Sequence, residues 1–158
     1  MEIPRIEIRE RGKAPRRLAT AYGQASRNAW RETGNWYHDN LRPKRFTVAH
    51  GKAAGYKPRK GDELPWGTKA FWRSYVGRKV RKFKHRDPLV FTGTSKRRSQ
   101  MRTVVAQRNV AKLRYSVQAF NYHPYMQSEF RRILPVEAQQ LGRVYDMNLD
   151  QELDKIKS

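Results

Sequence analysis

Histidine is the side chain of this sequence best suited to metal binding or to proton transfer near neutral pH, and the chain has four. They are His38, His50, His85 and His123, which lie far apart and lack the spacing of a metal site. We therefore predict that each is a surface or structural histidine, and we expect no metal and no cofactor. The absence of cysteine excludes disulfides, zinc-thiolate sites and a cysteine nucleophile.

Two short segments carry part of a catalytic signature. Thr68 precedes Lys69 instead of following it, and the glycines at 61 and 67 are wrongly spaced, so this segment is not a phosphate-binding Walker loop. The sequence His-Asp-Asn at 38–40 has residue types found in nucleases, but the same residues suit the last turn of a helix. Because no catalytic acid–base pair accompanies either segment, we expect a protein that is not an enzyme.

Charge is the strongest chemical signal in the sequence. The 158 residues include 35 Lys and Arg against 14 Asp and Glu, which gives a formal charge of +21. Residues 41–117 alone hold 22 basic and 3 acidic side chains, whereas residues 118–158 hold 5 and 6. An excess confined to one region predicts a directed basic surface and a polyanionic partner.

Much of this charge lies in a basic stretch interleaved with aromatic residues. The candidate DNA-contacting or polyanion-contacting residues are Arg73, Arg78, Lys79, Arg81, Lys82, Lys84, Lys96, Arg97 and Arg98. Such a stretch neutralises phosphates without reading base sequence, so binding should be nonspecific and sensitive to salt. A solvated basic face, or ion pairs with an acidic neighbouring protein, is the alternative interpretation.

The aromatic residues of this stretch have two interpretations. Phe71, Tyr75 and Phe83 fall on one face of a predicted helix together with Val76 and Val80. Core packing accounts better for this arrangement than stacking on bases does. No zinc-finger, leucine-zipper or ribonucleoprotein signature accompanies the stretch.

The elements that must position these residues are indicated by periodicity. Apolar residues recur at steps of three and four from about 15 to 38 and from 130 to 156, which predicts a long N-terminal helix and a C-terminal helix. Pro135 is expected to open or kink the second of these. Alternating residues in 101–107 and 110–117 predict a hairpin that turns at residues 108–109.

Two further segments complete the predicted fold, which is α+β. Residues 51–67 hold four glycines and two prolines without any period, which predicts a long basic loop that could become ordered on assembly. Residues 71–84 form a short basic helix, and residues 1–12 an extended arm or edge strand. We predict one domain over 1–158, in which a small antiparallel β-sheet packs with the N-terminal and C-terminal helices.

Hydropathy argues against a membrane. The first residues lack the apolar segment of a secretion signal, and no apolar run approaches the roughly 20 residues of a spanning helix. We therefore expect neither a secretion signal nor a membrane anchor.

The order of these features resembles a known group of proteins. Residues 88–93 read Pro-Leu-Val-Phe-Thr-Gly, with basic residues and Ser99 shortly behind; a hairpin, the Asn-Tyr-His-Pro turn at 121–124 and the helical segment 129–137 follow. Over residues 14–156, the chain resembles the neck and minor tail component proteins of long-tailed bacteriophages, which act in tail completion and head–tail joining. It departs from them at 94–96, where Thr-Ser-Lys replaces the leucine-like residue usual behind Thr-Gly.

The resemblance implies a non-enzymatic structural protein of the virion, assembled in the host cytoplasm. Copies would form a ring, with a roughly six- or twelve-fold arrangement, in the neck between the portal-side connector and the tail. Its partners would be portal-adaptor, connector and tail proteins, together with packaged DNA bound nonspecifically. The implied assembly contacts are Tyr56, Trp66, Trp72, Pro88, Phe91, Thr92, Gly93, Tyr122 and Tyr125.

A nonspecific nucleic-acid-binding protein of the ribosomal or ribonucleoprotein type is the alternative, because composition alone fits it equally well. Such a protein would bind RNA as a monomer, with an affinity that falls steeply with salt, whereas a neck protein should self-associate. A small nuclease or toxin would need an acid–base pair that the sequence does not provide.

Overall fold

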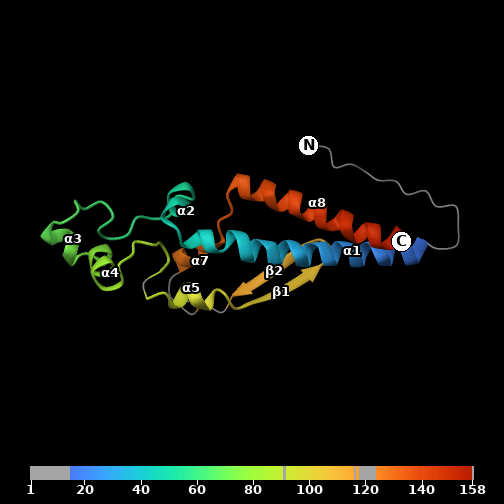
Figure 1. The fold of residues 1–158 in the computed structure, drawn as a ribbon, viewed down its shortest axis with the longest axis horizontal. Coiled ribbons are helices and arrows are strands. Elements are labelled where there is room, and N and C mark those ends of the chain that lie inside the picture. The colour runs from blue at the N-terminus through green and yellow to red at the C-terminus, as the bar shows by residue number, and fades with distance from the viewer. Residues whose placement is uncertain (1–14, 91, 116, 118–123, 158) are drawn as a thin grey trace.

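The computed structural model describes residues 15–90, 92–115, 117 and 124–157. It confirms the α+β fold class. The long helices α1 (Pro15–Trp36) and α8 (Pro135–Lys157) lie side by side. On its other side α1 packs against the antiparallel hairpin of β1 (Arg102–Gln107) and β2 (Val110–Tyr115), as Figure 1 shows. We call α1, α8 and the hairpin the body.

The hairpin has the turn that its sequence predicts. Gln107 pairs with Val110, so the two residues between the strands are Arg108 and Asn109. Small side chains allow the sheet to approach α1, because a Cβ added at Gly34 would lie only 3.2 Å from Val104. Alternate strand residues thus face the helix and solvent, which is the expected pattern for a sheet with one wet face.

Hydrogen bonds contribute much of the contact between α1 and α8. The Ser26 hydroxyl lies 2.9 Å from the Tyr145 hydroxyl, and the Asn28 amide donates to Glu152 over 2.7 Å. The ring of Tyr145 also packs on Trp30, with 4.4 Å between centroids. Among the described residues, no apolar side chain of α8 is fully buried. The two helices therefore share specific polar contacts, and the leucines within α8 stay half-buried.

Short helices connect the body to the rest of the molecule. The chain leaves α1 through a π-helical turn (Tyr37–Leu41), a 3-10 turn (Pro43–Phe46) and α2 (Val48–Ala53), whose first turn is capped by the Thr47 hydroxyl. Here the side chains of Phe46, Leu89, Val90, Val117 and Phe130 form a small hydrophobic core. This core ties together segments from the middle and the end of the chain.

The predicted helix over 71–84 is in fact two helices, α3 (Lys69–Arg73) and α4 (Tyr75–Phe83). Ser74 separates them: its backbone is extended, and its hydroxyl caps α4 by accepting the Gly77 N–H over 3.0 Å. A side chain on Gly77 would overlap the carbonyl of Phe71, so glycine is what lets α4 fold back onto α3. We call residues 54–86 the lobe; it forms the left end of Figure 1.

The remaining predictions can be placed on this fold. The loop expected over 51–67 begins later, because its first three residues complete α2; residues 54–68 contain no helix or strand. Helix α5 (Thr94–Arg98) was not predicted, whereas Pro135 opens α8 after α7 (Pro124–Arg131) as expected. The predicted arm at 1–12 lies outside the described residues. Within the described part of the chain, no helix is long and apolar enough to cross a membrane.

Candidate basic surfaces and a cationic pocket

The structure places the predicted polyanion-contacting residues in two separate groups. The exposed members on α3, α4 and the residue that follows them are Arg73, Arg78, Arg81, Lys82 and Lys84. The second group, Lys96, Arg97 and Arg98, is exposed on α5, nearer the hairpin in Figure 1. The basic surface predicted from sequence is thus divided between the lobe and the edge of the body.

The position of Lys79 differs from the prediction that this residue contacts DNA. Its side chain is only 4% exposed, because α4 turns this face toward the loop and the segment before Leu89. The ammonium group donates a hydrogen bond to the Asp87 carbonyl and lies 5.8 Å from the centre of the Tyr75 ring. Burial lowers the pKa of Lys79 to about 8, although Asp87 and Asp62 oppose the shift. Lys79 cannot contact the backbone of a DNA duplex from this position.

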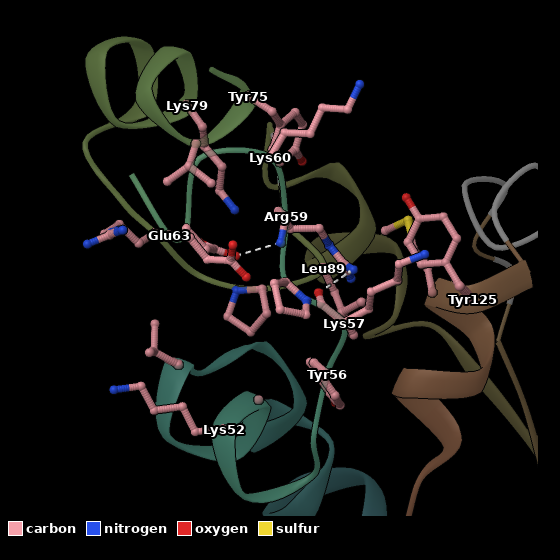
Figure 2. Close-up of a pocket in the computed structure, with 18 of the residues that line it drawn as sticks. Lys52, Tyr56, Lys57, Arg59, Lys60, Glu63, Tyr75, Lys79, Leu89 and Tyr125 are labelled. Carbon is pink, nitrogen blue, oxygen red and sulfur yellow. Dashed lines mark hydrogen bonds between the residues drawn. The ribbon is translucent and has the colours of Figure 1, made fainter. Parts of the chain in front are cut away.

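Lys79 instead lines a pocket of about 950 Å³ between the lobe and the rest of the molecule. Figure 2 shows its side chain extending from α4 into the space bounded by Arg59, Leu89 and Tyr56. Other walls come from α2 and from Tyr125 of α7. The pocket is therefore built from four stretches of sequence that are far apart in the chain.

Cations dominate the lining of this pocket. Seven lining residues are Lys or Arg and two are acidic: Lys52, Lys57, Arg59, Lys60, Arg78, Lys79 and Arg86, against Asp62 and Glu63. The guanidinium of Arg59 forms an ion pair with Glu129 and lies 4.9 Å from the centre of the Tyr125 ring. The Asp62 carboxylate accepts the backbone N–H of Arg59 over 2.7 Å, which fixes the loop. Two of the charged groups thus hold the wall together, and most of the other cations stay exposed at the rim.

A second buried cation lies where α2 meets α8. Arg45 is fully buried, and one of its nitrogens, Nη1, lies 2.6 Å from the Glu137 carboxylate and 3.0 Å from Nε2 of His50. Burial alone would raise the pKa of Glu137, but hydrogen bonds from Arg45 and from the Leu134 N–H lower it below its usual value. We call Arg45, His50 and Glu137 the junction.

The buried histidines support the structural interpretation of the sequence. Burial and nearby arginines lower the pKa of both His38 and His50, so both are neutral at physiological pH. His38 stacks on the Tyr115 ring, and His50 belongs to the junction. His123 lies outside the described residues. In the part of the chain that the structure describes, no three His, Asp or Glu side chains are placed to hold a metal ion.

The implied assembly residues fall into distinct environments. Trp66 is 61% exposed, and its ring lies against both Phe71 and Trp72; Tyr125 is 46% exposed. Thr92 is exposed, whereas Gly93, Pro88 and Trp72 are half-buried. Phe91 and Tyr122 lie outside the described residues.

Tyr56 has a structural role as well as a place in the pocket. Its ring packs against the small hydrophobic core, and its hydroxyl donates to the Arg45 carbonyl over 3.3 Å. Tyr56 is thus a half-buried residue with structural contacts, and its role in assembly stays a prediction.

Sequence reasoning missed the cations of the pocket wall. Lys52, Lys57, Arg59 and Lys60 all belong to the segment predicted as a Gly/Pro loop, and their density in that loop was the available signal. The ion pair of Arg45 had no such signal, because Glu137 is 92 residues away. No family model, curated protein or solved structure matches this chain.

Proposed function

We propose that this chain is a structural protein of a tailed-phage virion, whose copies form a ring in the neck that joins the DNA-filled head to the tail. The sequence resemblance suggests this role, and the distribution of charge along the molecule is the observation that carries it. The lobe exposes basic side chains at one end of an elongated molecule. The C-terminal half of α8, at the opposite end, exposes Asp146, Asp150 and Asp154.

These acidic residues make a ridge that could meet the lobe of another copy. They are spaced four residues apart, so they lie on one face of α8. A basic surface and an acidic surface at opposite ends of one chain favour head-to-tail contact between copies, and such contact closes into a ring when the rotation permits.

The exposed cations would then divide into two uses. Those of the lobe that face the next copy would pair with its α8, and the remaining ones, with the group on α5, would meet DNA phosphates in the channel. Such contacts are electrostatic and independent of base sequence, so DNA retention should weaken as salt rises. The role proposed here is mechanical, with no chemical step.

The first test is the native mass of nuclease-treated protein across a salt series, with negative-stain images of each species. We expect a discrete ring. Replacing Asp146 and Asp150 by Lys should convert the ring to monomers, because like charges would then face each other across the contact. The matched control replaces Gln139 and Gln140 by Lys, which adds two positive charges to an exposed part of the same helix away from the ridge.

Each outcome separates the two candidate functions. A ring lost only in the ridge variant supports the neck protein. A wild-type chain that stays monomeric at every salt concentration and associates only with added nucleic acid would contradict it and favour the ribonucleoprotein alternative.

A further inference from the structure

The charge of Lys79 is incompletely satisfied by the protein. An ammonium group has three hydrogen-bond donors, and the structure supplies one acceptor, the Asp87 carbonyl. Within the described residues, no carboxylate lies within ion-pair distance of it. A buried cation without a carboxylate is costly, and the cost is recovered when an anion enters beside it.

The environment of Lys79 indicates what kind of anion would fit. The pocket that Lys79 lines also has apolar walls, namely Val76, Leu89, Pro58 and Pro88, and the ammonium lies 5.8 Å from the centre of the Tyr75 ring. These groups offer contact area to the carbon atoms of a ligand. A single carboxylate carried on a side chain with apolar neighbours matches them better than a phosphodiester does.

The rim of the pocket suggests that the carboxylate belongs to a chain with further negative charges. Lys52, Lys57, Lys60, Arg78 and Arg86 surround the opening and are exposed. Their density would repel a basic segment and attract an acidic one, which increases both the association rate and the specificity. The pocket also has room for several residues, because its volume is about 950 Å³ and its lining includes α2 and Tyr125 of α7.

We propose that this pocket docks an extended acidic peptide of a neighbouring protein, one carboxylate of which pairs with the buried Lys79 while an adjacent apolar side chain packs on the pocket wall. This inference is independent of whether the chain forms a ring. It assigns Lys79 and the rim cations to protein recognition and leaves the exposed cations of α5 to DNA. Duplex DNA does not fit beside Lys79, because this side chain is only 4% exposed. The phosphates of a duplex would contact the rim cations first.

The test uses the full chain and the fluorescein-labelled peptide Asp-Leu-Glu-Phe-Asp-Leu-Glu, with fluorescence anisotropy as readout. The control peptide has Asn and Gln in place of the four acids. We expect the acidic peptide to bind at least about tenfold more tightly than the amide peptide. Equal binding of the two peptides would overturn the proposal.

A pair of variants locates the contact. Lys79→Met should weaken binding of the acidic peptide by about tenfold or more, since it removes a desolvated charge partner but retains the shape of the side chain. Lys82→Met, on the exposed face of the same helix, should change the affinity less than about twofold. Unchanged peptide affinity in Lys79→Met would contradict the proposal. If Lys79→Met instead lost affinity for a single-stranded oligonucleotide and kept its affinity for the peptide, the pocket would be assigned to nucleic acid and the proposal would also be wrong.

A wild-type measurement keeps the test decisive even if a variant misfolds. The groups that face Lys79 are Asp87, the loop residues Asp62 and Arg59, and the ring of Tyr75. Because the ammonium of Lys79 loses its proton before an exposed lysine does, affinity for the acidic peptide should fall between pH 7 and pH 10 before the rim lysines titrate. An affinity that stays constant until about pH 10 would show that only exposed lysines bind the peptide.

Discussion

Among the buried cations of the described residues, Arg45 and Lys79 lie in contrasting surroundings. At the junction, Arg45 has a carboxylate 2.6 Å away on Glu137 and a histidine beside it. At the pocket, Lys79 has a backbone carbonyl and an aromatic ring but no carboxylate partner among the described residues. The comparison teaches that burial of a charge does not by itself identify a site. The built-in counter-ion of Arg45 serves the fold, whereas Lys79 lines a pocket and keeps hydrogen-bond donors that a ligand could use.

The chemistry of the two side chains suits these roles. The planar guanidinium of Arg45 can contact a carboxylate and a ring nitrogen at once, which makes it a good fixed connector between helices. The ammonium of Lys79 is compact and loses its proton more readily when buried. Lys79 can therefore release its proton above about pH 8 while the pocket is empty, which an arginine could not do.

The largest effect should come from removing the counter-ion of the junction. Glu137→Gln leaves Arg45 charged, buried and unpaired, and should lower the free energy of unfolding by about 4 kcal/mol. Urea denaturation followed by circular dichroism measures the loss. Gln139→Ala, at an exposed position two residues further along α8, is the control and should change little. A Glu137→Gln protein as stable as the wild type would show that Arg45, like Lys79, does not need a carboxylate partner.

The second effect concerns the aromatic packing of the lobe, the region that contains Lys79. Phe71 is fully buried, where it packs on Trp66 and Trp72, so Phe71→Ala should cost about 3 kcal/mol. Hydrogen exchange should show the loss in the lobe and leave the α1–α8 pair of the body protected. Leu64→Ala, at a partly exposed position of the same lobe, is the matched control. Equal loss of protection throughout the molecule would show that the pocket wall and the body unfold as one unit.

The third prediction compares the pH dependence of stability in the wild type and in Lys79→Met. The folded chain releases the Lys79 proton near pH 8, whereas the unfolded chain keeps it to about pH 10.5. Between these values the unfolded state binds more protons, so wild-type stability gains as pH rises. Lys79→Met should thus be the more stable protein at pH 7, by roughly 2 kcal/mol, and should lose this advantage by pH 10.5.

Parallel urea titrations of the two proteins across that range measure this difference. Because all other lysines and tyrosines are common to both chains, their titration cancels in the comparison. A constant difference from pH 7 to pH 10.5 would mean that Lys79 is not desolvated in the folded state.

The smallest effect concerns the break between α3 and α4. Ser74→Ala removes the cap of α4 and should cost about 1 kcal/mol, because the Gly77 N–H loses its acceptor. Ser128→Ala, exposed on α7, provides the control. If the break serves to aim Lys79 into the pocket, the variant should also bind the acidic peptide more weakly. If the variant keeps the wild-type affinity for the peptide, the cap at Ser74 does not contribute to binding in the pocket.

The fold could be read from sequence where the signal lies within one element. The helices at both ends and the hairpin follow from periodicity, and Pro135 opens α8 because proline suits a first helical turn. The break at Ser74 was missed because apolar residues continue on both sides of it with nearly helical spacing. Only the close approach of Gly77 to α3 requires the chain to turn there.

The candidate site could be predicted in its charge but not in its geometry. Sequence identified the basic stretch of α4, and most of it is exposed. It could not identify Lys79 as the exception, because the burial of this side chain depends on Arg59, Leu89 and the loop, which come from elsewhere in the chain. Tertiary packing determines which of several neighbouring cations is buried away from solvent.

The hydrogen bonds between α1 and α8 have a consequence for the time during which the protein is being made. The ribosome completes α1 long before α8 emerges, so the face of α1 that will receive α8 stays uncovered in the growing chain. That face presents Ser26 and Asn28 to its later partner, and α8 in turn brings Tyr145 and Glu152. Hydroxyl and amide groups on this face make the nascent chain less prone to associate with its neighbours than a face of large apolar side chains alone would.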